Sequence, residues 1–436
     1  MKIVFLGAGS HFFESVLQEI SQTKSLHGSE ILLYDINPER VEIIHALGGR
    51  ISDHFKAGLR LRVASELAEA LDGADAAVSS IGVHGPGFAW HRLDVEAVAK
   101  FGIMQTTGDT VGPSGISQAL RIIPIYLEIA AEMEKRCPEC VLLNHSNPMG
   151  AICRAVGKYS KIKCVGYCHN VAGAMLTFSE MLEVPATELD FTVAGINHMV
   201  WLLSLRHRGS DVYPLLKERI LEREMPHGRH FTKELLEITD LYMIGGDRHI
   251  IEFFPHARVA DSVETIPYGL KWRSHMIAEG KLTEELTREA SEIRARAAGD
   301  SPLLLPELES PEAMGRQIEA LKFGPDMLHV VNTRNDGAVS NLPPWAVVEL
   351  KAVVGMHGAS SVSVGEMPPQ AARWTLAQIY ANELIIDAAA EGSRRKALQA
   401  LASDPMIRDF REAGEVLDAL VVAQQGRLDP FRKAER

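Results

Sequence analysis

The first ten residues, MKIVFLGAGS, constrain the fold more strongly than any other segment of the chain. The apolar run Ile3–Leu6 leads directly into Gly7, Gly9 and Ser10. A buried strand, a glycine-rich turn and a helix open a dinucleotide-binding fold, because glycines let the backbone approach a pyrophosphate whose charge the helix N-terminus favours. Phe12 stands where a third glycine is usual, so the motif needs support from its context.

That context is a second apolar run, Glu30–Tyr34, which ends in the acid Asp35. An acid at this place holds the ribose hydroxyls of NAD and repels the 2′-phosphate of NADP. Arg40 lies close by in the sequence and would attract that phosphate, which keeps NADP as an alternative. We therefore predict an NAD site at the glycine-rich turn and Asp35; the alternative is an ordinary strand–turn–helix with an acid in a loop.

Apolar runs and helical patterns alternate up to about residue 190, which predicts an α/β fold with a Rossmann-type doubly wound parallel sheet. A long helix is expected over Ile116–Lys135. The alternation loosens after this point, which indicates a second, mixed α/β domain. We expect an NAD-binding domain over residues 1–193 and a domain for substrate, metal and oligomerisation over residues 194–436. The expected parallel strands are Val4–Leu6, Ile31–Tyr34, Leu61–Val63, Ala76–Ile81, Val141–Leu143 and Val165–Tyr167.

The composition argues against several classes of protein. A net charge of -12 disfavours nucleic acid or an anionic membrane surface as the partner. The sequence holds no run of about 18 apolar residues that could span a membrane. A core-type strand directly follows Lys2, so the N-terminus lacks the sequence pattern of a signal peptide. Five cysteines are too few for a disulfide framework in a chain of 436 residues, so we expect a cytoplasmic protein.

Short polar motifs follow several of the expected strands. In a doubly wound sheet, ligands bind at the carboxyl ends of the strands, so these motifs are the candidate active site. The five motifs are Thr107–Ile116, Asn144–Met149, Gly166–Asn170, Gly195–His198 and Gly245–His249.

Two residues in these motifs, Cys168 and His198, could share one divalent metal. A thiolate and an imidazole, completed by oxygen ligands, suit Mn, Co, Ni or Fe in an open site. The alternatives are a small buried cysteine and a satisfied core histidine. Cys137 and Cys140 form a C-x-x-C pair, which we interpret as part of a surface loop rather than half of a zinc site.

Taken together, the ordered motifs resemble those of the NAD- and metal-dependent glycosidases of glycoside hydrolase family 4. The resemblance covers nearly the whole chain, and Ser114 stands where the family usually has a glycine. The matching motifs are the G-A-G-S start, Gln105–Pro113, Asn147–Pro148, Gly166–His169, Gly195–His198, Asn335–Gly337 and Asn341–Pro343.

The resemblance implies a mechanism. NAD takes a hydride from C3 of the sugar, which acidifies the proton on C2. A metal such as Mn, held by residues matching Cys168 and His198, binds the oxygens on C2 and C3. A base then removes the C2 proton, the bond from C1 to the leaving group breaks by elimination, water adds and NADH returns the hydride. The cofactor is therefore recycled.

Residue roles follow from the same resemblance. His169 is the expected acid for the leaving group, and Asn147 is expected to contact substrate hydroxyls or the metal region. Asp109 is assigned to the cofactor. The base is the least determined role: Asp247 and Glu252 are the candidates for base and orienting carboxylate, with Tyr268 in reserve. Glu252 could instead be an ordinary paired carboxylate.

The run from Gly245 to Pro255 looks closest to family members that act on uronides. Arg248 or Arg92 could hold a uronate carboxylate through two hydrogen bonds, although either could be a salt bridge at the surface. We therefore expect an α-galacturonidase acting on unphosphorylated small saccharides. The alternatives within the family are an α-galactosidase, an α-glucosidase or an α-glucuronidase, and the resemblance implies a homodimer or homotetramer.

Two alternative functions from other classes of protein remain open. An NAD-dependent 2-hydroxy acid dehydrogenase shares the opening fold, but it would release NADH and would not need Cys168 and His198. A non-catalytic NAD sensor would bind without turnover. Both account less well for polar motifs gathered at the ends of strands.

Overall fold

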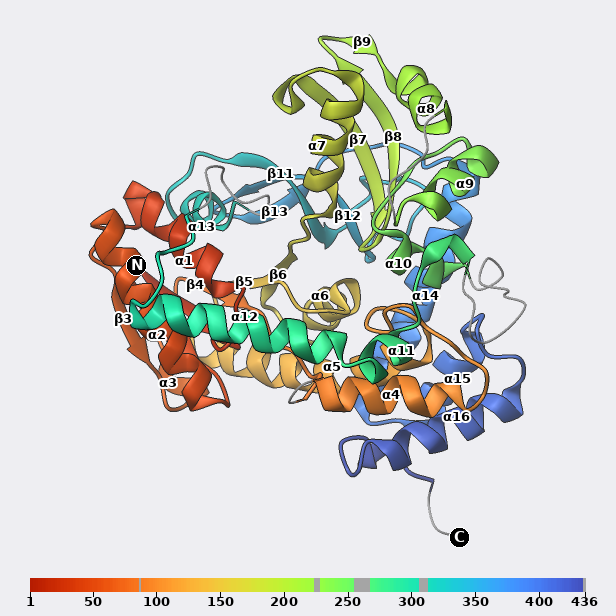
Figure 1. Cartoon of the computed structure of the whole chain (residues 1–436), viewed down its shortest axis with the longest axis horizontal. Helices are drawn as coiled ribbons and strands as arrows, with labels where there is room; N and C mark the ends of the chain where they lie inside the picture. The colour runs from red at the N-terminus through yellow and green to blue at the C-terminus, as the bar shows by residue number, and fades with distance from the viewer. Residues whose placement is uncertain (86–87, 223–227, 255–266, 306–312, 434–436) are drawn as a thin grey trace.

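The apolar runs of the N-terminal half form six parallel strands at one end of a large mixed sheet (Figure 1). The computed structural model describes residues 1–85, 88–222, 228–254, 267–305 and 313–433. The parallel strands lie in the order β3-β2-β1-β4-β5-β6, which is the doubly wound order of a dinucleotide-binding fold. This confirms the predicted Rossmann-type sheet. The strands are β1 (Lys2–Leu6), β2 (Glu30–Tyr34), β3 (Arg60–Val63), β4 (Ala76–Ser79), β5 (Val141–Asn144) and β6 (Lys163–Gly166).

The second half of the chain continues the same sheet with antiparallel strands. The order beyond β6 is β11, β12, β7, β8 and β10, with β13 beside β12 and β9 beside β8. Residue 193, the expected domain boundary, lies inside β7, and the division into two domains stays a prediction. These strands are β7 (Leu189–Ile196), β8 (Met199–His207), β9 (Ser210–Asp211), β10 (Met243–Ile244), β11 (Met327–Arg334), β12 (Val347–Gly355) and β13 (Gly358–Ser361).

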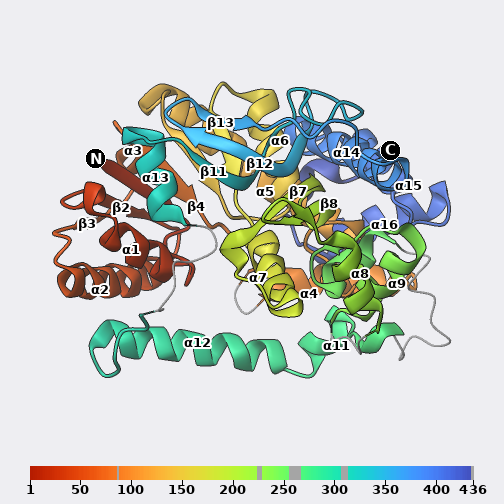
Figure 2. The same cartoon turned by 90° about the horizontal axis from the view of Figure 1, so that it is seen from above.

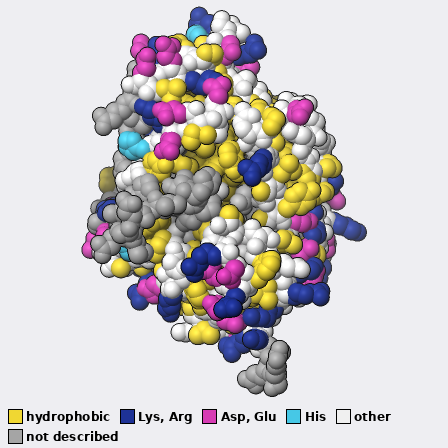
Figure 3. Space-filling model, turned by 90° about the vertical axis from the view of Figure 1, so that its right-hand side faces the viewer, with side chains coloured by type: hydrophobic (Ala, Val, Ile, Leu, Met, Phe, Trp, Pro, Cys, Tyr) yellow, Lys and Arg dark blue, Asp and Glu magenta, His cyan; other side chains and the backbone are white. Residues whose placement is uncertain are grey.

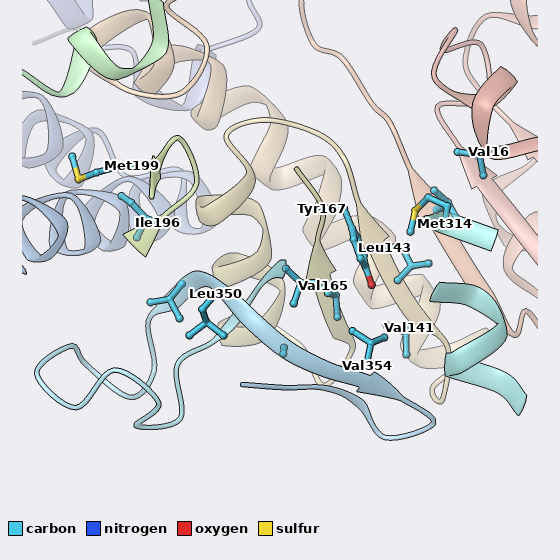
Figure 4. Packing of buried hydrophobic residues seen from close by; sticks show 14 of the residues in the cluster. Val16, Val141, Leu143, Val165, Tyr167, Ile196, Met199, Met314, Leu350 and Val354 are labelled. Atoms are coloured by element: carbon cyan, nitrogen blue, oxygen red, sulfur yellow. The ribbon is translucent and has the colours of Figure 1, made fainter. Parts of the chain in front are cut away.

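Hydrophobic packing joins the parallel and antiparallel strands. Figure 4 shows Val141 of β5 and Val165 of β6 beside Val354 of β12, while Leu350 of β12 lies towards Ile196 of β7. All five side chains belong to one buried cluster. The parallel and antiparallel parts of the sheet therefore share a core.

Helices cover both faces of the parallel strands, which explains their uninterrupted apolar sequences. In β1, Ile3 and Phe5 point into the cluster that contains residues of α1 and α2, whereas Val4 and Leu6 point into the cluster that contains residues of α5 and α6. The helices on these two faces are α1 (Phe13–Gln22), α2 (Pro38–Phe55), α3 (Leu67–Leu71), α4 (Ala89–Ala99), α5 (Gly112–Arg136) and α6 (Met149–Tyr159).

The later helices surround the antiparallel strands and return to the first half. Figure 2 shows α12 along one side of the molecule, between α11 and α2. The helices are α7 (Asn170–Leu182), α8 (Tyr213–Glu222), α9 (His230–Thr239), α10 (Asp247–Ile250), α11 (Arg273–Ala278), α12 (Lys281–Ala298), α13 (Met314–Phe323), α14 (Pro369–Glu391), α15 (Arg394–Ser403) and α16 (Phe410–Ala423). Short 3-10 turns occupy Lys24–Leu26, Ala186–Glu188, Ile251–Phe253, Pro267–Gly269 and Asp429–Phe431.

Two helices differ from the sequence-based expectation. The expected helix at Ile116 begins earlier, at Gly112, because Gly112 adopts a φ of +73° and Pro113 can occupy the first turn, where no backbone N–H is needed. Helix α4 was not expected. It buries His91 and Asp94, so its inner face lacks the apolar periodicity by which an amphipathic helix is recognised.

Charges of both signs are interspersed on the surface drawn in Figure 3. Hydrophobic side chains gather across the middle of the same face. Within the described residues, every helix is too short or too polar to cross a bilayer.

Candidate active site

One row of the sheet connects two of the polar motifs. Gly166 of β6 pairs with Asn332 of β11, Asn332 pairs with Glu349 of β12, and Glu349 pairs with Gly195 of β7. Both glycines are closely packed: a Cβ on Gly195 would lie 2.0 Å from the carbonyl oxygen of Met199. The segments that carry Cys168 and His198 thus start from a common row of strands.

A buried carboxyl fixes the turn that precedes His198. Oε2 of Glu349 accepts hydrogen bonds of 3.0 Å from Nδ2 of Asn197 and from Nδ2 of Asn332. Burial raises the pKa of Glu349, and the charge of His169 acts in the opposite direction. The charge of His169 also lowers the pKa of His198, so His169 lies within electrostatic reach of both residues.

His198 belongs to a compact polar cluster with Thr110, Asp109 and His249. Oγ1 of Thr110 donates to Oδ1 of Asp109 at 2.8 Å and lies 3.3 Å from Nδ1 of His198. The rings of His198 and His249 are 4.3 Å apart, and Nδ1 of His249 is 4.0 Å from Oδ1 of Asp109. These contacts join three motifs that lie far apart in the sequence.

Burial controls the charge of this cluster. It lowers the pKa of His198 to about 3, helped by the neighbouring His249, and it also lowers the pKa of His249. Burial alone would raise the pKa of Asp109, but the positive charge that His249 and His198 carry when they are protonated outweighs it and holds that pKa below its ordinary value. The cluster therefore combines neutral imidazoles with an ionised carboxylate.

The same contacts fit the predicted metal site. Because the Thr110 hydroxyl donates to Asp109, it can accept a hydrogen bond from Nδ1–H of His198, which leaves the lone pair of Nε2 for a metal. Cys168 is half-buried directly after β6. Among the described residues, no three His, Cys, Asp or Glu side chains gather into a complete ligand set. Substrate oxygens or Oδ1 of Asn147, which is buried without a hydrogen-bond partner within the described residues, would complete it.

Asp247 is engaged at the start of α9. It is fully buried, and its carboxylate accepts hydrogen bonds from the backbone N–H groups of Phe231 and Thr232 at 2.8 and 3.0 Å, as well as from the Thr232 hydroxyl. A carboxylate held in this way caps a helix, and both of its oxygens are engaged by hydrogen-bond donors.

Glu252 is engaged in a second backbone site. Its Oε1 accepts from the N–H groups of Thr106, Thr107 and Gly108 at 2.8, 3.0 and 3.1 Å, and its Oε2 also accepts from Gly108. The carboxylate thus organises the loop that leads to Asp109. The contacts of Asp247 and Glu252 are those of positioning groups rather than of a base with a free oxygen.

The reserve candidate Tyr268 lies against Phe231, with ring centroids 5.1 Å apart. Burial and a hydrogen bond to Glu234 raise the pKa of Tyr268 above its ordinary value. Its phenolate is therefore harder to form than that of a free tyrosine.

The two candidate arginines occupy different surroundings. Arg92 pairs with Glu96 along α4 at 2.9 Å, with 57% of its side chain exposed. Arg248 is an exposed residue of α10 beside His249, and its carbonyl oxygen accepts a hydrogen bond from the Thr106 hydroxyl at 2.6 Å. Of the two, Arg248 lies beside the cluster around Asp109, because it directly precedes His249 in α10, and its charge lowers the pKa values of His198 and His249.

The glycine-rich turn has the geometry that a nucleotide needs. Gly7 has a φ of +78°, and a Cβ there would lie 2.5 Å from the carbonyl oxygen of Ser80. Ser10 shares a hydrogen bond of 2.9 Å with the hydroxyl of Ser80. Asp35 follows β2 and accepts a bond of 2.9 Å from the N–H of Gly9. The turn is thus close-packed, and it precedes helix α1 as a pyrophosphate site requires.

Three site residues were missed at the level of sequence. His249 and Thr110 lie within recognised motifs, so a polar side chain one position from a candidate was the available signal. Arg273 lies outside every motif, in the first position of α11. Its backbone N–H donates to the carbonyl oxygen of Gln105 at 2.8 Å, a contact that only the folded chain creates.

The fold and the site define an α/β enzyme with a dinucleotide-binding half and a polar centre between its parallel and antiparallel strands. The model of the Family 4 glycosyl hydrolases matches residues 2–184, and that of the Family 4 glycosyl hydrolase C-terminal domain matches residues 193–407. The chain therefore belongs to the family 4 glycosyl hydrolases, and the predicted family is confirmed.

Individual relatives cover nearly the full length. The chain is 29% identical to an alpha-galactosidase of Bacillus subtilis, over 93% of both chains. It is 28% identical to an alpha-galacturonidase of Thermoanaerobacterium saccharolyticum, over 99% of this chain and 97% of the relative. A 6-phospho-alpha-glucosidase from gut microorganisms, solved with NAD and Mn²⁺, has the same fold, with a TM-score of 0.82, 22% identity and 98% of each chain covered.

Proposed function

We propose that this enzyme hydrolyses unphosphorylated α-galacturonides with the help of NAD and a divalent metal such as Mn. The observation that carries the proposal is the position of Arg248 beside the cluster of Asp109, His198 and His249. A polar centre with an adjacent arginine suits a sugar that carries a carboxylate. The relatives named alpha-galacturonidase at 28% identity support the same substrate class.

The cofactors fit residues of this chain. The glycine-rich turn and Asp35 would hold NAD, and Cys168 and His198 would hold the metal. When bound, NAD exchanges a hydride with C3 of the sugar while the metal draws electron density from the neighbouring sugar oxygens. NAD and Mn²⁺ bound to a protein of the same fold support this assignment.

The surrounding residues would then act as the general base and the general acid of the reaction. We propose that His249 accepts the proton from C2, because it lies next to His198 and its Nδ1 is 4.0 Å from the carboxylate of Asp109, which would stabilise the imidazolium. His169, beside Cys168, would protonate the leaving group. Asp247 and Glu252 would keep α10 and the loop at Asp109 in place around His249.

A neutral galactoside is the main alternative substrate, because the alpha-galactosidase of Bacillus subtilis matches with similar identity. The dehydrogenase reading is not retained, because models of a glycosidase family match both halves of the chain. The predicted homodimer or homotetramer stays a prediction.

The test is hydrolysis of a substrate panel under reducing conditions, with and without NAD and Mn²⁺. The panel holds digalacturonate, the nitrophenyl α-galactoside and α-glucoside, and phosphorylated glucosides. We expect cleavage of digalacturonate that needs both cofactors and leaves no net NADH. Cleavage of a neutral or phosphorylated glycoside alone would contradict the uronide proposal, and accumulation of NADH without bond cleavage would contradict the recycling of the cofactor.

A further inference from the structure

Arg273 is a buried cation at the edge of the candidate site. It begins α11, and only 7% of the residue is exposed. Its backbone N–H is bonded to Gln105, which precedes the loop that carries Asp109. The backbone of Arg273 is therefore tied to the same loop that Glu252 organises.

The guanidinium of Arg273 has neutral neighbours. Its Nε donates to Nε2 of His91 at 3.2 Å, and its Cζ lies 5.4 Å from the centre of the Phe88 ring. Burial lowers the pKa of His91 to about 3, so this imidazole carries no charge that could repel the arginine. Within the described residues, Arg273 forms no ion pair with a carboxylate.

An unpaired buried charge is expensive, because water has been removed without a counterion in its place. Burial and the charge of Arg248 accordingly lower the pKa of Arg273, while Asp109 and Glu252 act in the opposite direction. Arg273 therefore lies beside the loop that leads to Asp109, and among the described residues it has no anion to balance its buried charge.

We propose that Arg273 binds the carboxylate at C6 of the sugar and makes the enzyme selective for uronides. This inference rests on the proposed function, whose substrate class it explains. Because Nε is engaged by His91, the two terminal nitrogens are the donors left for a ligand. Two N–H groups that point forward from one planar fork match the two oxygens of a carboxylate. Arg248 lies at the exposed side of the same centre and adds a second positive charge.

The experiment compares the nitrophenyl α-galacturonide with the nitrophenyl α-galactoside, which differ only at C6. Arg273→Met should lower kcat/KM for the galacturonide by about 100-fold. For the galactoside, the same variant should change kcat/KM by less than about 3-fold. Arg273→Lys keeps the charge but loses the fork, and it should lie between Arg273→Met and the wild type. Arg288→Met is the control, since Arg288 lies on α12 with 67% of its side chain exposed.

A loss of equal size on both substrates would overturn the proposal, because it would mark a structural role for Arg273. Ligand binding gives a second, independent readout through the melting temperature of the NAD-loaded protein. Galacturonate should raise this temperature for the wild type and for Arg288→Met but not for Arg273→Met, while galactose should not discriminate between the variants.

The binding readout also separates this inference from the proposed function. If the wild type cleaves no galacturonide, but galacturonate raises its melting temperature and not that of Arg273→Met, the anion site is supported and the proposed reaction is contradicted. If Arg273→Met cleaves galacturonides as well as the wild type does, the proposed reaction is supported and the anion site is overturned. Stabilisation by glucose 6-phosphate in place of galacturonate would overturn the assignment to a carboxylate.

Discussion

At the scale of single residues, the contacts of a side chain decide whether it can do chemistry. Asp247 begins α10 and Glu252 follows this helix in the sequence, and backbone N–H groups donate to the carboxylates of both. His249 lies between them, and within the described residues its buried Nδ1 has no hydrogen-bond partner. The residue suited to move a proton is thus the one whose neighbours leave it available.

Replacing His249 by Gln should lower kcat by about 100-fold or more, since a positioned proton acceptor contributes on this order. The melting temperature shift caused by NAD should not change, because the glycine-rich turn is untouched. Steady-state kinetics on the best substrate of the panel measures the effect. The control is His357→Gln, at an exposed position after β12. Wild-type kcat in the His249 variant would contradict its role.

At the scale of elements, carboxylates cap helices either from another segment or from the helix's own N-cap position. Asp247 of α10 caps α9, whereas Asp409 caps α16 from its own N-cap position with bonds of 2.8 and 2.9 Å to the N–H groups of Arg411 and Glu412. The first cap connects two elements near the candidate site, and the second is local. Their loss should therefore have different consequences for activity.

Asp247→Asn keeps one acceptor oxygen and should destabilise the protein by about 1–2 kcal/mol, because one buried N–H loses its partner. We expect kcat to stay within about 10-fold of the wild type, as for a positioning group. Chemical denaturation and kinetics are measured together, with Asp409→Asn as the control that changes stability alone. A fall in kcat of about 1,000-fold with a normal fold would instead identify Asp247 as the base.

At the scale of the whole molecule, the C-terminal helices return to the N-terminal half. Asp94 of α4 is fully buried and accepts bonds from Arg121 of α5 and from Nε2 of Gln424 at the end of α16. Burial raises the pKa of Asp94, and Arg121 opposes that rise. The hydrogen bond from Gln424 to Asp94 joins segments that are 330 residues apart in the sequence.

Arg121→Met should destabilise the protein by about 3–5 kcal/mol, because it leaves the buried carboxylate of Asp94 without a counterion. The double variant Asp94→Asn, Arg121→Met should recover part of the loss, since it removes both charges. Denaturant unfolding measures both, and Arg62→Met is the control because Arg62 pairs with Glu30 at the surface with 60% of its side chain exposed. If Arg121→Met were as stable as Arg62→Met, this account of the buried ion pair would be contradicted.

Much of the fold could be predicted, because it rests on patterns within short segments. The strand before Gly7 and the acid after β2 follow from local apolar periodicity and turn residues. Helix α4 could not be predicted in this way, because its buried residues include His91 and Asp94, which find partners in Arg273 and Arg121. Such partners are known only once distant segments have packed.

The sequence by itself determined the dinucleotide-binding half, the family and the segments that form the site, because ordered motifs and local periodicity carry that information. The tertiary structure alone decided that the antiparallel strands extend the same sheet, that Asp247 and Glu252 are held by backbone groups, and that Arg273 is buried against His91 without a carboxylate partner among the described residues. The physical reason is that burial and hydrogen-bond partners, which set the charge and availability of a side chain, depend on neighbours hundreds of residues away.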